Sequence, residues 1–326
     1  MLILITFPKP TRVCVTKDRI MRIPEYLSPT SIKLFYDDIE EFYMRYLSDV
    51  RRARDPQTQP MSIGSAFDAY VKSYLHEKIF GKGATAGGPY ELETIFENQV
   101  EAHNRDWAWE HGKRVFEEYK KIGCLADLML ELGKAIGPPR FEFDVKGEIE
   151  GVPLLGKPDV FFINEQGARV IYDWKVNGYC GKALKSPMKG YLKLREGITC
   201  KTHKDCYIIR FQGIDINVGM TLEEGDQGWA SQLAIYGWLL GEPVGSEQLI
   251  TGIDQICGPA SRLRFASHRL KVSPDYQFAL LENITNAWDI ILSDWIFRDM
   301  DEESSRKRCL ILDQPISEEY QWMLSK

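Results

Sequence analysis

The chain has 326 residues, a formal net charge of −6 and 44% apolar residues, values typical of a globular protein. No apolar run approaches the 18 residues of a transmembrane helix, and the acidic balance argues against a protein that coats nucleic acid with its whole surface. The apolar start at residues 1–7 lacks a basic leader, so we expect a strand rather than a signal peptide. Seven cysteines in such a chain indicate reduced thiols and a cytoplasmic protein.

The first third of the chain shows helical patterns. Ser28 followed by Pro29 predicts a helix start, and apolar residues then recur every three or four positions. A second helix is expected over 64–79, and the glycine-rich stretch 81–89 predicts a loop. Two or three further helices are expected within 91–136.

Strand patterns begin near Phe141. The stretch 141–175 alternates or is β-branched between glycines, which predicts a meander of three strands, whereas 177–228 predicts an irregular basic segment. The elements expected after it are a helix at 229–240, strands at 248–256 and 261–271, and a long helix that starts at Pro274. Helices and a sheet in one chain predict an α/β or α+β fold. We expect a single domain over 1–326, with a helical insertion at 81–140 and a basic insertion at 177–228.

Two aspartates are predicted to face each other across a hairpin. A three-residue loop at 165–167 ends on a glycine, the residue that such loops favour at their left-handed position. Asn164 then pairs with Ala168, and the same register places Asp159 opposite Asp173. Their Cβ atoms would lie about 4.5–5.5 Å apart, where two bare carboxylates repel each other and a divalent cation between them removes the repulsion.

Lys175 shares a strand face with Asp173, because residues two apart in a strand point the same way. Its ammonium would lie beside the proposed metal and hold a phosphate oxygen or a metal-bound water, while Trp174 would point into the core. The alternative is an ion-pair ladder on an exposed edge strand. Apolar neighbours on both faces favour a buried hairpin, where charges need partners or a metal.

With these motifs the chain resembles the PD-(D/E)xK nuclease superfamily, in particular its RecB-like branch, which includes phage exonucleases. Pro158-Asp159 and Asp173-Trp-Lys175 match the family motif, and Gln232-Leu-Ala-Ile-Tyr236 matches the QxxxY motif of that branch. The stretch 28–36 is similar to the opening helix of the branch. These motifs occur in the family's order between about residues 28 and 240.

The resemblance implies a restriction-endonuclease-like core, a central mixed β-sheet flanked by helices. It also implies a Mg²⁺- or Mn²⁺-dependent nuclease acting on single- or double-stranded DNA, and an exonuclease rather than an endonuclease. Such a protein would act in recombination or repair in the cytoplasm of a bacterium or a phage-infected host. The alternative is a non-catalytic nucleic-acid-binding or partner-docking protein that retains the fold.

The resemblance also assigns roles to residues. The implied metal ligands are Asp68, Asp159, Asp173 and the Trp174 carbonyl. The implied catalytic residues are Asp159, Asp173, Lys175, Gln232 and Tyr236, of which the last two would position Lys175.

Three features depart from the branch, one of them being that 56 residues separate Lys175 from Gln232, whose motifs usually lie close together. Gly64-Ser-Ala-Phe-Asp68 has aspartate where the branch usually has a histidine ligand, and aspartate is a hard oxygen ligand suited to Mg²⁺ or Mn²⁺. Iron–sulfur members have a Cys-Pro pair after the opening helix and three cysteines near the C-terminus. Here Asp38-Ile39 takes the place of the pair and only Cys309 lies near the end, so we expect no cluster.

A basic segment follows the proposed site. Residues 182–210 carry a formal charge of +6 in a chain of −6, so the remainder carries −12. Its basic residues are Lys182, Lys185, Lys189, Lys193, Arg195, Lys201, Lys204 and Arg210. Most charge runs are solvated loops, but this one is predicted to contact the phosphates of DNA.

Overall fold

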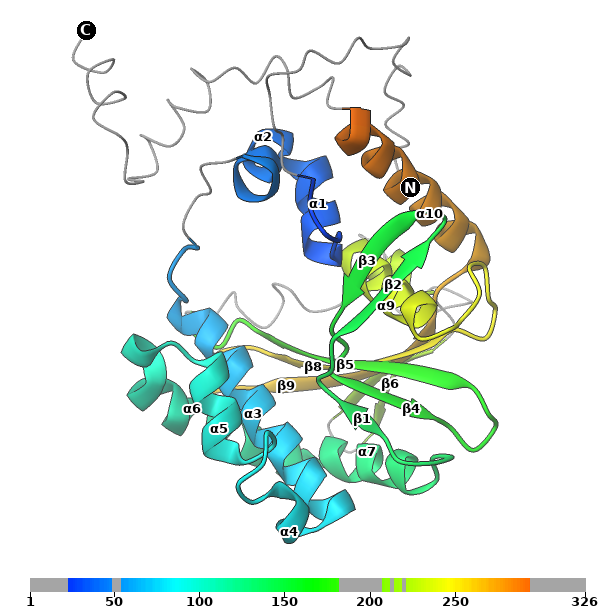
Figure 1. The fold of residues 1–326 in the computed structure, drawn as a ribbon. Coiled ribbons are helices and arrows are strands. Elements are labelled where there is room, and N and C mark those ends of the chain that lie inside the picture. Colours follow the sequence, from blue (N-terminus) through cyan, green and yellow to red (C-terminus); the bar gives the residue numbers. More distant parts are fainter. Residues whose placement is uncertain (1–22, 49–53, 182–206, 212–213, 219–220, 294–326) are drawn as a thin grey trace, which may run out of the picture. The chain divides into compact units, whose positions relative to one another are not determined.

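The computed structural model of the protein describes residues 23–48, 54–181, 207–211, 214–218 and 221–293 (Figure 1). By their internal contacts these residues form two compact units. The described residues of the first unit lie within Met1–Asp55, Val145–Gly156 and Asp275–Lys326, and those of the second within Pro56–Asp144 and Lys157–Pro274. The strand expected at 1–7 lies outside the described residues. The single-domain organisation with two insertions stays a prediction.

The first unit begins with helix α1 (Pro29–Asp37), and the predicted cap is confirmed, because Ser28 accepts a hydrogen bond from the Ser31 backbone. Helix α2 (Ile39–Phe42) and a π-helical turn (Tyr43–Leu47) follow. Asp38 separates α1 from α2, because its carboxylate caps the second helix through the Glu41 N–H at 2.9 Å. The apolar residues that recur every three or four positions after Ser28 therefore belong to two helices, α1 and α2, and not to one continuous helix.

The first unit also contains a hairpin of β2 (Val145–Ile149) and β3 (Val152–Gly156). Its two turn residues, Glu150 and Gly151, have φ of 48° and 78°, the left-handed conformation of the tight turns that favour hairpins. Leu27 forms a parallel bridge with Leu154, in which the Leu27 N–H donates to the Pro153 carbonyl and the Leu155 N–H donates to the Leu27 carbonyl. The predicted long helix is α10 (Pro274–Ser293), which buries Ile284, Trp288 and Ile291 among others.

The second unit is built on a seven-stranded mixed sheet. In spatial order its strands are β1 (Arg140–Phe141), β4 (Val160–Ile163), β5 (Arg169–Asn177), β8 (Ile250–Cys257), β9 (Arg264–Lys271), β7 (Ile214–Val218) and β6 (Tyr207–Phe211). The pairs β5–β8 and β7–β9 are parallel and the other neighbours are antiparallel. This architecture confirms the predicted α/β fold with a mixed sheet flanked by helices.

The predicted three-stranded meander over 141–175 was wrong. The tight turn at 150–151 closes β2 and β3 into a separate two-stranded sheet, while β4 and β5 join the large sheet together with β1. Strand alternation shows which residues are extended but not which strands pair. The segment 177–228 was also predicted as irregular, yet β6 and β7 pair within it and helix α8 (Leu222–Gly225) follows.

Helices of the second unit cover the sheet. They are α3 (Gln59–Phe80), α4 (Lys82–Thr85), α5 (Leu92–Gln99), a 3₁₀ turn (Ala102–Asn104), α6 (Arg105–Ile122), α7 (Cys124–Gly133) and α9 (Gln227–Leu239). The expected loop at 81–89 therefore includes the short helix α4. Figure 1 shows α3 beside α5 and α6, which it contacts. The approach of α3 to α6 needs Gly112, because a Cβ there would lie 2.4 Å from the Ala66 Cβ.

Aromatic packing fixes α3 against the middle of the sheet. The rings of Phe67 on α3 and Tyr119 on α6 lie 5.3 Å apart, and Phe67 also packs edge-on against Trp174 of β5. Each of these three side chains is at most 7% exposed. Among the described residues, no helix combines the length and the apolarity needed to cross a membrane.

Candidate metal and nuclease site

The hairpin of β4 and β5 has the predicted register. Val160 pairs with Tyr172 and Phe161 with Ile171, and Gly167 has the expected left-handed φ of 82°. One further step along this register brings Asp159 opposite Asp173. Oδ2 of Asp159 also accepts a hydrogen bond of 3.1 Å from the Trp174 N–H, which ties the two strand ends together.

Asp159 and Asp173 form a carboxyl pair that resists carrying two negative charges, in which Asp173 is buried and the Asp159 side chain is 21% exposed. Asp173 is 3% exposed, and burial, reinforced by the Asp159 charge, raises the pKa of Asp173 to about 8. Burial also opposes ionisation of Asp159, but the charges of Lys72 and Lys175 and hydrogen bonds from Asp173 and the Trp174 N–H together hold the pKa of Asp159 below its ordinary value. A nearby cation would allow both carboxyls to ionise.

Lys175 lies beside this pair. Its ammonium makes an ion pair with Asp173 and donates a 3.0 Å hydrogen bond to Oε1 of Gln232. The Gln232 amide in turn donates to the Tyr236 hydroxyl at 3.0 Å, one turn further along α9. Burial disfavours the charge on Lys175, but the ion pair with Asp173 together with the charge of Asp159 raises the pKa of Lys175.

Trp174 points away from Lys175, as the alternation of a strand requires. Its indole N–H lies 3.2 Å from the Tyr119 hydroxyl in the core, which confirms the predicted inward orientation. The side chain therefore anchors β5 to α3 and α6, while its main-chain carbonyl belongs to the strand that carries Asp173 and Lys175.

Asp68 lies in the same pocket, but its Oδ2 already has two partners. Lys72 contacts it at 2.6 Å, and the Gln99 amide donates to it at 2.9 Å. Burial, with the charges of Asp159 and Glu142, raises the pKa of Asp68 to about 7 against the opposing effect of Lys72. The carboxyl of Asp68 is thus part of a network that the sequence did not reveal.

Sequence reasoning missed Lys72, Gln99 and Glu142. The ammonium of Lys72 lies 3.1 Å from carboxylate oxygens of both Glu142 and Asp159, and Gln99 donates to Glu142 at 2.7 Å. Lys72 stands four residues after Asp68 on one helix, a spacing that could have suggested their pairing. Glu142 follows β1 with a strained φ of 36°, which no local pattern predicts.

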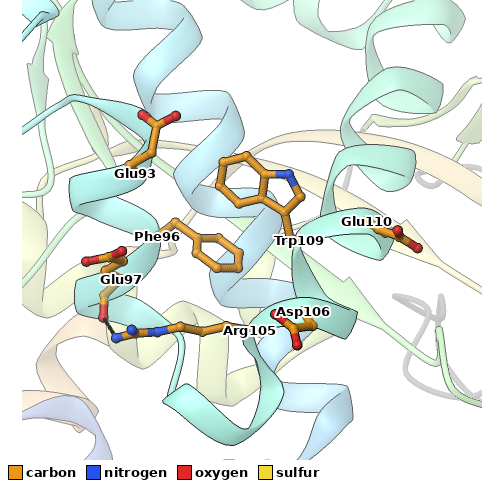
Figure 2. Close-up of a pocket in the computed structure, with 7 residues that line it drawn as sticks. All are labelled: Glu93, Phe96, Glu97, Arg105, Asp106, Trp109 and Glu110. Carbon is orange, nitrogen blue, oxygen red and sulfur yellow. Dashed lines mark hydrogen bonds between the residues drawn. The ribbon is translucent and has the colours of Figure 1, made fainter.

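These groups line a pocket of about 300 Å³ (residues Gly64, Ser65, Phe67, Asp68, Lys72, Gln99, Glu142, Asp159, Asp173, Trp174, Lys175 and Val176). A larger hollow of about 460 Å³ lies between α5 and α6 (Figure 2). Its lining residues are Glu93, Phe96, Glu97, Arg105, Asp106, Trp109 and Glu110. Four carboxylates against one guanidinium would repel a phosphate chain, so the smaller pocket is the better candidate for nuclease chemistry.

The predicted DNA-contacting residues fall almost entirely outside the described part of the chain. They are Lys182, Lys185, Lys189, Lys193, Arg195, Lys201 and Lys204. The backbone of Arg210 belongs to β6. The role of this basic segment stays a prediction.

Comparison with known families decides the family. The family model of the PD-(D/E)XK nuclease superfamily matches residues 26–188, half of the chain, including Asp68, Asp159, Asp173 and Lys175. The chain belongs to the PD-(D/E)XK nuclease superfamily. The members of this superfamily are nucleases that generally use divalent metal ions.

Two solved structures are similar to this member of the superfamily at low identity. One is a protein described as "Putative exonuclease" from Eubacterium rectale, with 16% identity, a TM-score of 0.43 and coverage of 82% of this chain and 80% of the other. The other is SSO0001, with 10% identity, a TM-score of 0.25 and coverage of 78% and 84%. No curated protein matches the chain.

The residues of the pocket fit a divalent metal. Asp159 and Asp173 offer hard carboxylate oxygens, and their burial as a pair leaves a negative charge that a cation would offset. Within the described ranges, no three His, Cys, Asp or Glu side chains by themselves form a group that could hold a metal ion. Three carboxylates converge instead on the ammonium of Lys72.

The raised pKa values of Asp68 and Asp173 predict an inverse pH dependence of stability without metal. Carboxyls that titrate near 4 when unfolded and near 7 to 8 when folded bind more protons in the folded state. Their contribution to stability is therefore complete below about pH 4 and is lost as the pH rises through about 8. Urea unfolding in EDTA should show this fall, and Asp173→Asn should flatten it and raise the stability at pH 8. An equally steep fall in the variant would contradict the assignment.

Proposed function

We propose that the protein is a metal-dependent deoxyribonuclease that degrades DNA from an end. The observation that carries the proposal is the pair of Asp159 and Asp173, opposed across the hairpin, with Lys175 on the same strand as Asp173. Family membership supports hydrolysis of phosphodiester bonds in nucleic acid. Action from an end, and a role in recombination or repair, rest on the sequence resemblance to the RecB-like branch.

The ligand set would be Asp159, Asp173 and the Trp174 carbonyl, with Asp68 as a further candidate ligand. A bound Mg²⁺ or Mn²⁺ ion would supply Lewis-acid activation of water and neutralise charge on the phosphate. The Trp174 N–H bond to Asp159 holds that carboxylate at the end of β4. The indole of Trp174 is buried against Phe67, and this contact fixes the position of β5, the strand that carries Asp173 and Lys175.

Lys175 is the residue that would act on the phosphate. Its side chain is 20% exposed and lines the pocket, so its ammonium would reach a phosphoryl oxygen and offset the charge that develops there. Gln232 fixes its direction by accepting a hydrogen bond, and Tyr236 fixes Gln232. This chain of contacts gives the QxxxY pair a positioning role.

The rival function is a non-catalytic nucleic-acid-binding or partner-docking protein that retains the fold. Aspartate at the histidine position of the branch is the feature that favours it. A binding module, however, has no need of two carboxylates opposed across one hairpin, because close carboxylates repel each other.

Asp173→Asn should abolish divalent-dependent cleavage of labelled DNA while the protein stays folded, because the variant loses one of the two opposed carboxylates. Linear and circular substrates, single- and double-stranded, should be incubated with Mg²⁺, with Mn²⁺ and with EDTA. Degradation of linear but not circular DNA would support action from an end. Cleavage that persists in EDTA or in the variant would rule out the proposed chemistry, and no cleavage by the native protein would favour the rival.

Lys175→Ala should lower kcat by about 10²-fold or more, because an ammonium that meets charge developing at the phosphate stabilises the transition state more than the bound substrate. Mn²⁺ binding, measured by calorimetry, should persist. Tyr236→Phe, which removes only the outermost hydroxyl of the chain of contacts, is the matched control and should lose much less. A variant with weaker DNA affinity and unchanged kcat would make Lys175 a binding residue.

The basic segment 182–210 should bind the DNA backbone, because it is positively charged in an otherwise acidic chain. Changing Lys182, Lys185, Lys189 and Lys193 together to Glu should weaken the binding of long DNA at low salt. The slope of log K against log[salt] should flatten by several units, while hydrolysis of a very short oligonucleotide changes little. An unaltered slope would show that DNA is bound elsewhere.

A further inference from the structure

Lys72 lies at the centre of the carboxylates that line the pocket. Its side chain is 1% exposed, and its ammonium contacts Asp68 at 2.6 Å and both Glu142 and Asp159 at 3.1 Å. These three carboxylates come from α3, from the residue after β1 and from the residue before β4. A single ammonium therefore joins three segments that are distant in sequence.

Burial separates the role of Lys72 from that of Lys175. The Lys175 side chain is 20% exposed, whereas Lys72 is covered on all sides and has no surface to offer a DNA strand. A buried ammonium is stable only if nearby anions compensate its desolvation, and three carboxylates do so here. The charge of Lys72 thus acts on the carboxylates and not on the substrate.

The charges of the pocket balance with one divalent ion. The lining residues include four carboxylates, Asp68, Glu142, Asp159 and Asp173, and two ammoniums, Lys72 and Lys175. With all six ionised, the formal charge is −2. One Mg²⁺ or Mn²⁺ ion would neutralise it, whereas two would leave an excess positive charge in the pocket.

We propose that Lys72 is a built-in cation in place of a second divalent metal, so that the site binds a single Mg²⁺ or Mn²⁺ ion at Asp159 and Asp173. The inference rests on the proposed metal-dependent function. It adds that the site binds one metal ion and that Lys72 limits the number to one. Lys72 is a positioning residue in this scheme, since it holds Asp68, Glu142 and Asp159 in one cluster.

Gln99 supports this assignment. Its amide nitrogen donates to Asp68 at 2.9 Å and to Glu142 at 2.7 Å, the same two oxygens that contact Lys72. Its Oε1 is buried and, among the described residues, has no hydrogen-bond partner. Without the ammonium, the three carboxylates that now face Lys72 would repel one another unless a second cation took its place.

The test is the number of Mn²⁺ ions bound in the absence of DNA, measured by calorimetry and by the electron paramagnetic resonance of free Mn²⁺. The native protein should bind one ion. Lys72→Met, which keeps the length of the side chain and removes its charge, should bind two. Lys157→Met is the matched control. Lys157 also contacts Glu142, at 2.5 Å, but it is 52% exposed and touches that one carboxylate, so the variant should still bind one ion.

Each outcome bears on the proposal. Two ions in the native protein, or one ion in Lys72→Met, would overturn it while leaving the nuclease function intact. No ion in the native protein would overturn the one-ion inference together with the proposed metal dependence. If Lys72→Met does not fold in EDTA, it should be refolded against Mn²⁺. Two ions per folded molecule are then expected, and recovery with one ion would contradict the proposal.

Discussion

The opposition of two carboxylates across one hairpin is the constraint on which the rest of the site depends. Asp159 and Asp173 are held together by the ladder of β4 and β5, so neither can move away from the other without breaking strand pairing. Charge repulsion at this separation must be met by protons or cations. The ammonium of Lys72 contacts Asp159 and that of Lys175 contacts Asp173. A metal ion between the two carboxylates would offset the remaining negative charge.

The core and the site use neighbouring residues of the same elements. On α3, Phe67 packs against Trp174 while the next residue, Asp68, faces the pocket. On β5, Trp174 points into the core while Asp173 and Lys175 flank it on the other face. A change in the aromatic packing would therefore shift the carboxylates as well, so the precision of the site derives from a close-packed interior.

Asp68 and Lys72 offset each other's charge, and Asp68 stands where the resemblance to the RecB-like branch implies a histidine. A histidine ligand is neutral, whereas aspartate adds a negative charge to a pocket that already contains Glu142, Asp159 and Asp173. Lys72, one helical turn further on, offsets that charge at 2.6 Å. The pair therefore preserves the net charge of the pocket while it exchanges a possible metal ligand for an internal ion pair.

The sequence by itself determined the features that depend on near neighbours in the chain. The Gly167 loop set the register that opposes Asp159 to Asp173, Ser28 capped α1, and the spacing of Gln232 and Tyr236 put both on one face of α9. The tertiary structure alone decided that β2 pairs with β3 apart from the large sheet, and that Glu142 and Gln99 meet Asp68. Lys72 reaches Glu142 and Asp159 across 70 and 87 residues. Contacts of that range follow from the packing of α3 on β5, which no local periodicity encodes, because helical and strand spacing specify a face and not its partner.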